Sequence, residues 1–476
     1  IDMQSSKLSN NLWVADTNLP GVVKIDLSTM KIAGRYRTGG SYTSRTTVNS
    51  LGEAFVGARK DGTGTKTGVT KILPQGAKCV DTNKDGTVTS STGASDVKAY
   101  GQDDCVSWHV NTGGDIRGLA AQDIPGLNHA NACKGFTGES KEFDPKKVMA
   151  IDLHYVWIGG VHGKVYKLDA ATGKVLLTLT SPVQVYGMAL SGDGKLWLGA
   201  AGTIFGFIDT NKCTDQTTCE AAATCKATCT SQTCPATCDA AVKAVYSGAP
   251  GGYGITVDYK KRVWRSGYPA GPAFRYDPNG PAASRLAFST VTTYGGGIGA
   301  DASGWVWASH LSANTVARIH ADKMSGASIS VPSKGIAVDI KGRIFSVEYA
   351  GKVHMIVPGV TSSPTDFKLT KDAVTLNGVA YAYSDMTGVQ TRLASGEPGW
   401  YREIFSPCPA KSTTEFRFLS WDVEAPTGTW IMFNMRSADS AAALKTSPWY
   451  TVACLNPPGG KGRVKVSTFK GSHAEV

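Results

Sequence analysis

Short apolar stretches alternate with turn residues along most of the chain, and the arrangement recurs. The recurring unit reads G-[IMA]-x-[AVL]-x-x-x-G-x-[VIL]-[WF] and continues into a second strand that ends in a polar residue, as in "YGMALSGDGKLWLGAAGTIFGFID". Alternation of apolar and polar positions predicts β-strands that bury one face. The unit therefore predicts short antiparallel strands joined by tight turns.

One large aromatic residue anchors each repeat, and we expect it in the core of its blade. Neighbouring anchors lie about 40 residues apart, a period typical of propeller blades. The intervals from Phe55 to Trp157 and from Trp197 to Trp264 are longer, because they contain cysteine-bearing insertions. Seven anchors predict seven blades: Trp13, Phe55, Trp157, Trp197, Trp264, Trp307 and Phe345.

The first repeat lacks its leading strand. Residues 376–385, "LNGVAYAYSD", are expected to supply it, which would close the ring and remove two open sheet edges. Beyond these residues, alternation between Pro and Gly turns predicts a small β-sandwich. The sequence thus predicts an all-β protein: a seven-bladed β-propeller at 1–385 with insertions at about 74–105 and 211–240, and a sandwich-like domain with a basic, solvated or partner-bound tail at 386–476.

Composition and charge narrow the class. Among 476 residues, 55 are Gly and 18% are charged, which suits many strands and turns. No apolar run approaches the ~20 residues of a transmembrane helix. The first residues lack a basic region followed by an apolar stretch, so we expect the chain to start after any export signal or to have none.

The net charge is +11, and the basic residues are scattered. This pattern indicates a solvated surface, or affinity for an acidic polymer such as polysaccharide or extracellular DNA. The sequence has no stripe of Lys and Arg interleaved with aromatics, so specific nucleic-acid recognition is not expected.

Eleven cysteines indicate export through an oxidising compartment. Cys79 and Cys105 bracket the first insertion and are expected to pair, as are Cys408 and Cys454 in the C-terminal domain. Because the count is odd, one thiol is expected to be free or paired with another chain. Cys133 is the candidate, since it has no obvious local partner.

The second insertion contains six cysteines and starts at Cys213. Cys225 and Cys229, like Cys234 and Cys238, are spaced by one helical turn between Ala-rich flanks. This arrangement resembles an α-hairpinin, two short helices stapled by nested disulfides. The resemblance implies a helical hairpin with the pairs Cys225–Cys238 and Cys229–Cys234. Cys213 and Cys219 would then pair and close a small loop. Such a knob would serve recognition or polymer contacts, or would be a protease-resistant decoration.

The first insertion opens like a calcium loop. Asp81, Asn83 and Asp85 offer oxygens at alternate positions. Gly86 permits a sharp turn, and the carbonyl of Thr87 is the expected next ligand. Calcium is therefore the expected cofactor, with a structural role, because an ion and a disulfide would offset the ordering cost of so long a loop.

The loop lacks the bidentate Glu of an EF-hand, because its twelfth position is Thr92. Asp96, Asp103 or Asp104 would have to replace that Glu, and Asp96 joins the expected ligand set. The pattern C-V-D-x-N-x-D-G-T-V, followed by D-x-C-V-x-W, resembles an insertion of extracellular propeller proteins of Gram-negative bacteria, where it is interpreted as a calcium loop. The alternative is an Asx-rich turn without metal.

The repeats from residue 10 to about 385 resemble bacterial NHL-like propellers, which include the streptogramin B lyases. In these lyases a His commonly precedes the Gly-Ile of a repeat, and catalytic His and Glu side chains line one mouth of the ring. The matching positions here hold Tyr186, Tyr253, Gly297 and Lys334. His310 and Glu348, just past second strands, are the remaining candidates for a catalytic pair at that mouth.

These features predict a calcium-stabilised propeller at the cell surface of a Gram-negative bacterium, or secreted from it, that acts in binding, adhesion or extracellular assembly as a filament or surface-layer subunit. Expected partners are an extracellular or surface protein, copies of the chain itself, or acidic polysaccharide. The alternative is a lyase-like or metal-assisted enzyme with its site at one mouth of the ring. Because the lyase positions lack His, binding is favoured over catalysis.

Overall fold

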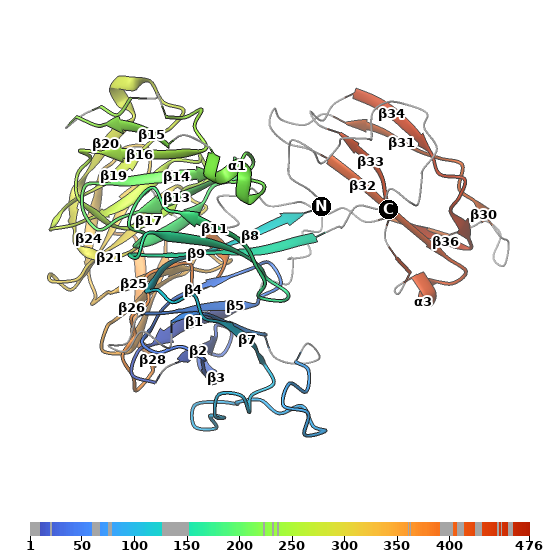
Figure 1. Ribbon diagram of the computed structural model, residues 1–476, viewed down its shortest axis with the longest axis horizontal. Helices are drawn as coiled ribbons and strands as arrows, with labels where there is room; N and C mark the ends of the chain where they lie inside the picture. The colour runs from blue at the N-terminus through green and yellow to red at the C-terminus, as the bar shows by residue number, and fades with distance from the viewer. Residues whose placement is uncertain are drawn as a thin grey trace. The chain divides into compact units, whose positions relative to one another are not determined.

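The computed structural model of the chain describes residues 10–19, 21–59, 67–74, 79–125, 152–221, 224–230, 233–235, 238–359, 361, 363–390, 403–406, 414–423, 431–444, 447–448, 450–455 and 460–476. The chain divides into two compact units: a propeller unit, residues 7–122 and 154–397, and a C-terminal unit, residues 398–476 together with 1–6 and 123–153 (Figure 1). Cys133 and Cys408 lie outside the described residues, so the expectations for them stay predictions. Cys454 is disulfide-bonded.

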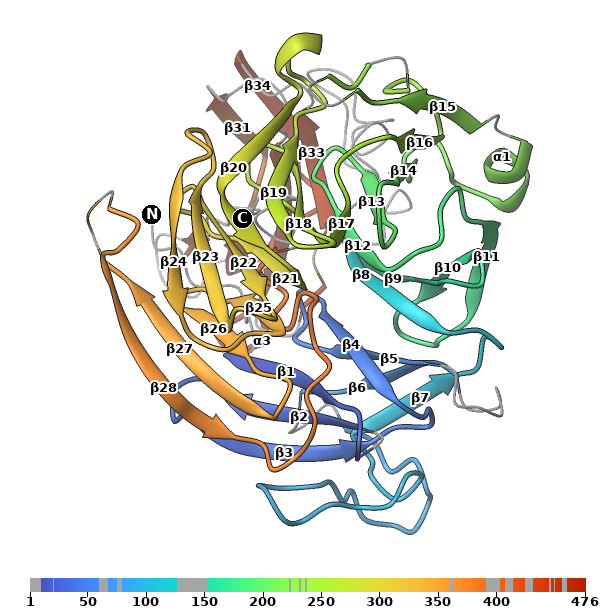
Figure 2. The ribbon, with the colours of Figure 1, turned by 90° about the vertical axis from the view of Figure 1, so that its left-hand side faces the viewer.

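Seven sheets form the described part of the propeller unit, and they follow one another around a ring (Figure 2). Blade one contains β1 (Asn11–Asp16), β2 (Gly21–Asp26) and β3 (Lys31–Arg37). Blade two contains β4 (Thr43–Val48), β5 (Ala54–Ala58), β6 (Gly68–Ile72) and β7 (Val106–Val110). Blade three contains β8 (Ile116–Pro125), β9 (Asp152–Gly160), β10 (Lys164–Asp169) and β11 (Val175–Thr180). Blade four contains β12 (Gly187–Leu190), β13 (Lys195–Gly199), β14 (Phe205–Asp209), β15 (Thr224–Thr228) and β16 (Lys243–Ser247).

Blade five contains β17 (Gly252–Val257), β18 (Val263–Gly267), β19 (Gly271–Tyr276) and β20 (Leu286–Thr293). Blade six contains β21 (Gly295–Ala300), β22 (Trp305–His310), β23 (Thr315–His320) and β24 (Gly326–Ser330). Blade seven contains β25 (Gly335–Val338), β26 (Ile344–Val347), β27 (Lys352–Pro358) and β28 (Phe367–Thr375). A 3-10 turn, η2 (Ala282–Ser284), precedes β20. The predicted all-β, seven-bladed propeller is confirmed.

The ring closes through the segment that follows the last blade. The N–H of Thr17 donates to the carbonyl of Val379 at 2.8 Å, and the N–H of Trp13 donates to the carbonyl of Met386 at 2.9 Å. This closing segment therefore lies along β1 and supplies the inner edge that blade one lacked. The closure predicted for residues 376–385 is confirmed.

Each blade core is built around its aromatic anchor, and all seven anchors are fully buried, as predicted. In blades five and six an Asp in the turn before the anchor holds the indole in place, Asp258 for Trp264 and Asp301 for Trp307. Asp301 accepts the backbone N–H of Trp305 at 3.0 Å and the indole N–H of Trp307 at 2.8 Å. On the next strand Arg318 lies opposite Trp307, with its guanidinium 5.2 Å from an indole ring centre. Truncating one such indole to Ala costs about 3–5 kcal/mol.

The inner strands of the blades all run in one direction, so the two faces of the ring differ. We call the face where these strands begin the mouth face, and the face where they end the loop face. The insertions follow the third strands β6 and β14, whose last residues, Ile72 and Asp209, pair with Ala54 and Lys195 beside the loop-face ends of the inner strands. Both insertions therefore leave from the loop face.

The first insertion covers the outer edge of blade one. A disulfide between Cys79 and Cys105 closes its base. The N–H of Gly93 donates to the carbonyl of Ala33 in β3 at 3.0 Å. The loop thus occupies a backbone group on an edge strand that would otherwise be open to pairing with another chain.

In the second insertion the structure joins the three expected pairs: Cys213–Cys219, Cys225–Cys238 and Cys229–Cys234. The predicted helical hairpin is wrong, because Thr224–Thr228 is strand β15, which pairs in parallel with β16. Among the described residues of the insertion, the helix is α1 (Gln216–Ala221). The segments between disulfides are much shorter than the ~12 residues that a helix needs to be stable alone. The edge of β16 offers backbone partners instead, and Thr favours a strand.

Helix α1 covers a second sheet edge, the outer strand β11 of blade three. The amide of Gln216 donates to the carbonyl of Thr178 at 2.7 Å and accepts its N–H at 3.0 Å. Glu220 accepts the N–H of Thr180 at 3.0 Å. Each insertion therefore covers the edge of the blade that precedes it.

The described residues of the C-terminal unit from residue 403 on form strands and one short helix. The elements are β29 (Ile404–Phe405), β30 (Thr414–Glu415), β31 (Phe418–Val423), β32 (Ile431–Ala438), α3 (Ala441–Leu444), β33 (Tyr450–Leu455), β34 (Gly460–Lys465), β35 (Lys470–Gly471) and β36 (His473–Glu475). The expectation of a solvated or partner-bound tail is wrong, because β36 lies between β29 and β32. Ala474 enters the core, and the buried Glu475 accepts from Nε of Arg436 at 2.8 Å.

Candidate ligand-binding mouth

Tyrosines from several blades meet at the mouth face. Tyr186 directly precedes β12, Tyr253 lies in β17, and Tyr381 and Tyr383 lie in the closing segment. The ring centroids of Tyr186 and Tyr253 are 4.8 Å apart, and those of Tyr253 and Tyr383 are 5.0 Å apart. Residues far apart in sequence converge here because the inner strands begin at the same end of the channel.

More exposed tyrosines surround this group. Tyr268 lies between Tyr253 and Tyr294, at 5.3 and 5.9 Å between ring centroids. Tyr349 lies 6.0 Å from Tyr381. Tyr42, Tyr268 and Tyr349 expose 50%, 37% and 48% of their surface, so aromatic faces are open to a ligand. We call the set the tyrosine mouth: Tyr42, Tyr186, Tyr253, Tyr268, Tyr294, Tyr349, Tyr381 and Tyr383.

Four basic side chains lie against these rings. The distances from charged group to ring centroid are 3.5 Å for Arg45 on Tyr383, 4.3 Å for Arg59 on Tyr381, 5.2 Å for Arg117 on Tyr186, and 5.0 Å for Lys334 on Tyr253. Asp115 forms an ion pair of 2.8 Å with Arg117. The ionised groups placed among these rings are thus mainly cations, which the faces of the phenol rings attract.

Two groups in the tyrosine mouth titrate in an unusual range. Burial lowers the pKa of Lys334 to about 8. Burial alone would raise the pKa of Tyr381, but the charge of Lys334 and a hydrogen bond with Tyr253, 3.1 Å between hydroxyl oxygens, lower it to about 8. The mouth therefore holds groups that change charge just above neutral pH, a property common at functional sites.

The two catalytic candidates from the sequence have different partners. His310 accepts the N–H of Ala313 at 3.1 Å, and its ring lies 6.1 Å from Tyr294 at the border of the tyrosine mouth. Glu348 lies 3.4 Å from Nε2 of the buried His354. The contacts of these two side chains therefore do not join them as a pair.

The residues that line the mouth include those found where the lyases carry His. Tyr186, Tyr253, Gly297 and Lys334 occupy these positions. Tyr253 and Lys334 lie against the ring of Tyr383, and Tyr186 lies against that of Tyr253. The sequence contained a signal for this site, because a Tyr directly precedes the first Gly of a repeat twice. Arg45 gave no such signal, since it lies inside β4 and reaches the site only through the ring.

The first insertion folds its acidic residues into turns. Asp81 accepts the N–H of Gly86 at 2.9 Å, Asn83 accepts that of Asp85 at 3.0 Å, and Asp85 accepts that of Thr87 at 3.0 Å. The bond from the backbone of Thr87 lowers the pKa of Asp85. The accepting oxygens of Asp81 and Asn83 keep a further lone pair, whereas Oδ1 of Asp85 also accepts the hydroxyl of Thr87 at 2.9 Å. These are oxygen donors of the kind that Ca²⁺ favours.

The three residues considered for the missing Glu have other roles. Asp103 and Asp104 are buried and accept backbone N–H groups of the loop, including that of Thr89 on Asp104 at 2.7 Å. Asp96 pairs with Lys98 at 2.8 Å. Within the described residues, no three His, Cys, Asp or Glu side chains come together in a group that could hold a metal ion. A calcium site would therefore need Asn83 and backbone oxygens in addition to Asp81 and Asp85.

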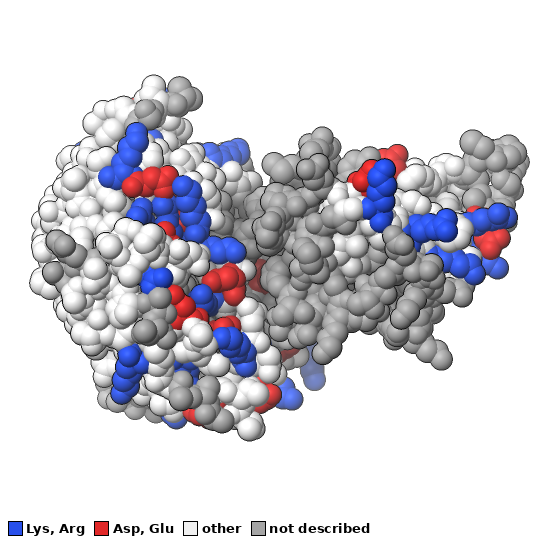
Figure 3. Space-filling view, turned by 90° about the horizontal axis from the view of Figure 1, so that it is seen from above, with Lys and Arg blue, Asp and Glu red and all other residues white. Residues whose placement is uncertain are grey.

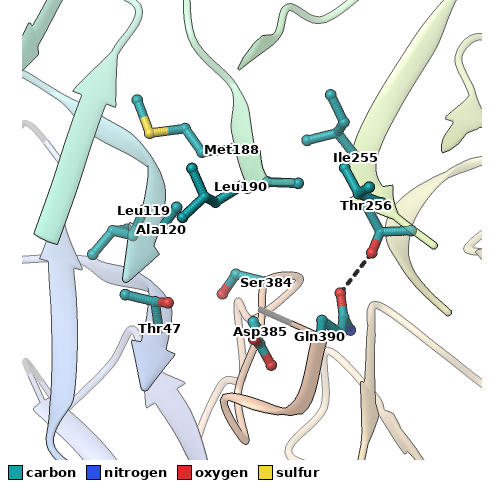
Figure 4. Close-up of a pocket in the computed structure, with 12 residues that line it drawn as sticks. Thr47, Leu119, Ala120, Met188, Leu190, Ile255, Thr256, Ser384, Asp385 and Gln390 are labelled. Atoms are coloured by element: carbon teal, nitrogen blue, oxygen red, sulfur yellow. Dashed lines mark hydrogen bonds between the residues drawn. The ribbon is translucent and has the colours of Figure 1, made fainter. Parts of the chain in front are cut away.

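The channel is filled below the tyrosine mouth. Ser384 bonds the carbonyl of Thr46 at 2.6 Å, and Gln390 accepts from the hydroxyl of Thr256 at 2.9 Å. These residues border a small cavity whose other wall includes Met188 (Figure 4). Residues 386–390 thus pack inside the propeller, and the propeller unit extends past the expected boundary at residue 385.

The outer surface shows no comparable concentration of charge on the face in Figure 3, where basic and acidic side chains are interspersed over the propeller. Within the described residues, no helix is long and apolar enough to cross a membrane.

The fold and the site define a disulfide-bearing, seven-bladed propeller with a cationic, tyrosine-lined mouth. No protein-family model and no curated protein matches the chain. Similar solved structures include a functionally unknown protein from Desulfotomaculum acetoxidans (11% identity, TM-score 0.43, 79% of this chain and 100% of the other) and apo AztD from Citrobacter koseri (13%, 0.43, 78% and 96%). Virginiamycin B lyase from Staphylococcus aureus is also similar (16%, 0.35, 56% and 78%).

Proposed function

We propose that this chain is an extracellular binding protein that takes an acidic carbohydrate at the tyrosine mouth. The observation that carries the proposal is that exposed tyrosines meet at one end of the channel together with more basic than acidic side chains. Tyrosine faces stack on sugar rings, and Arg and Lys attract acidic groups. Four disulfides among the described residues support an extracellular or periplasmic location.

The disulfide-closed insertions support a location at the surface of a Gram-negative bacterium. We expect Ca²⁺ to bind in the first insertion. Adhesion would use the same mouth with a surface glycan as partner. Assembly from copies of the chain is less favoured, because the C-terminal strand β36 is held inside its own sheet.

The test is calorimetric titration with oligogalacturonate, and with neutral maltoheptaose as the control sugar. Tyr349→Ala is expected to weaken binding of the acidic sugar about tenfold, in the range of one lost aromatic contact. Tyr259→Ala is the matched control, because Tyr259 is 45% exposed and lies beside Lys260, but follows β17 on the loop face. Equal affinity for both sugars, or equal effects of both variants, would contradict the proposal.

A lyase-like activity is the second candidate, favoured by the pairing of Tyr381 with Lys334. A phenol that ionises near pH 8 can act as a general base toward a carbon acid beside a carboxylate. Incubation with oligogalacturonate should then produce an unsaturated sugar that absorbs ultraviolet light, and Tyr381→Phe should abolish the product. Absence of product from the unaltered protein would reject this candidate and leave the binding proposal intact.

A further inference from the structure

Arg45 is buried in the tyrosine mouth without enough hydrogen-bond partners. It is 1% exposed, and its guanidinium lies 3.5 Å from the ring centre of Tyr383 and 5.3 Å from that of Tyr186. Its Nη1 donates to Ser44 at 3.3 Å. Its Nε and Nη2 have no hydrogen-bond partner among the described residues. Buried N–H groups of a charged side chain are costly to leave unpaired.

Other buried arginines have more hydrogen-bond partners, although Nε of Arg265 and Nε of Arg318 also have none among the described residues. Nη1 of Arg265 donates to the carbonyls of Gly202 and Ile204 at 3.2 and 3.0 Å, and its Nη2 donates to Ala200. Arg436 instead binds a carboxylate. Burial lowers the pKa of both Arg45 and Arg265 to about 9. The two side chains are therefore equally buried but differ in the number of their hydrogen-bond partners.

A second cation, Lys334, lies against the same tyrosine ring as Arg45. Nζ of Lys334 lies 5.0 Å from the ring centre of Tyr383, the ring on which Arg45 stacks, and donates to the carbonyl of Gly295 at 2.9 Å. The ion pair that Arg117 makes with Asp115 leaves these two charges without a carboxylate of their own. Two like charges among apolar rings disfavour each other, and an anion between them would relieve this.

We propose that Arg45 and Lys334 form a receptor for one carboxylate group of the ligand. Nε–H and Nη2–H lie on one edge of the planar guanidinium, and this fork matches the two oxygens of a carboxylate. The tyrosine faces around Arg45 favour a flat group. The inference rests on the proposed function, since it names the part of an acidic sugar that the mouth recognises.

The experiment compares oligogalacturonate with its methyl ester, which has the same sugar rings and no charge. Arg45→Lys keeps a charge but loses the fork, and Arg265→Lys is the control at a buried arginine whose two Nη groups donate to backbone carbonyls. We expect Arg45→Lys to weaken oligogalacturonate binding about tenfold or more, and to leave binding of the methyl ester unchanged. Equal weakening of both ligands, or no weakening, would overturn the receptor.

A second readout keeps this inference separate from the proposed function. Sodium acetate, with sodium sulfate as the tetrahedral comparison, should raise the melting temperature of the unaltered protein but not that of Lys334→Gln. If acetate acts in this way and no oligosaccharide binds, the receptor stands and the carbohydrate proposal fails. If oligosaccharide binds and neither Arg45→Lys nor Lys334→Gln affects it, the carbohydrate proposal stands and the receptor fails. Sulfate acting as strongly as acetate would overturn the preference for a planar carboxylate.

Discussion

The tyrosine mouth and the two insertions differ in how far their polar groups are hydrogen-bonded within the chain. In the insertions, carboxylates and amides are occupied by the chain itself, as when Asp104 accepts two backbone N–H groups or Gln216 pairs with β11. In the mouth, Arg45 keeps two buried N–H groups unpaired and three tyrosines stay exposed. A region that satisfies itself serves stability, whereas a region left unsatisfied at a free-energy cost is arranged for a ligand.

The largest effect is expected from removing the disulfide that closes the first insertion. The double variant Cys79→Ala/Cys105→Ala opens a loop of sequence separation 26 and is expected to lower the free energy of unfolding by about 2–4 kcal/mol. Denaturant unfolding measures the loss. Oligogalacturonate affinity of the folded variant should not change, because the loop covers β3 and not the mouth. A fall in affinity as large as that of Tyr349→Ala would break the separation between the two regions.

Local patterns in the sequence predicted the blades, because the turn Asp and the aromatic anchor are near neighbours, as with Asp301 and Trp307. The closing strand was predictable for the same reason, since its alternation is local. The helical hairpin was not, because Thr224–Thr228 becomes a strand through the edge of β16, which no spacing of cysteines reveals. In the mouth, Tyr186, Tyr253 and Lys334 stood out at repeat positions. Their meeting with Arg45 depends on closure of the ring.

Calcium binding is expected to stabilise the first insertion and to leave the tyrosine mouth unchanged. A site with a Kd of about 10⁻⁴ to 10⁻³ M would raise the free energy of unfolding by about 1.4–2.7 kcal/mol in 10 mM Ca²⁺. Thermal unfolding with CaCl₂, against MgCl₂ as control, measures the gain. Asp85→Asn should remove most of it, and Asp96→Asn should not, because Asp96 pairs with Lys98. An equal loss in both variants would contradict the assignment of Asp85 as a ligand.

The mouth should respond to pH, with affinity for the acidic sugar falling above pH 8. Lys334 has a pKa lowered to about 8, so it is charged at pH 7 and becomes neutral as the pH rises. Tyr381, also near 8, becomes an anion over the same range, and both changes disfavour a carboxylate. Arg45 loses charge near pH 9, whereas Arg117 stays charged. Calorimetry at pH 7 and 9 should show about a tenfold loss, or about 1.4 kcal/mol.

The variant Lys334→Gln separates this effect from alkaline unfolding. It should bind more weakly at pH 7 and lose less affinity between pH 7 and 9, since one of the titrating groups is gone. Maltoheptaose controls for changes in the mouth that do not depend on charge. A pH profile that is the same in the variant and the unaltered protein would show that Lys334 does not face the ligand.

The smallest effect tests whether the second insertion is a cover for a sheet edge. Gln216→Ala removes two hydrogen bonds to Thr178 at an exposed site and should cost about 1 kcal/mol. Thr217→Ala on the same helix is the control. Because the freed edge of β11 can pair with another chain, light scattering should show more association in Gln216→Ala than in the control. If the variant instead lost affinity for oligogalacturonate with its stability unchanged, the second insertion would belong with the tyrosine mouth as a recognition element, and the division between self-satisfied and ligand-ready regions would fail at this helix.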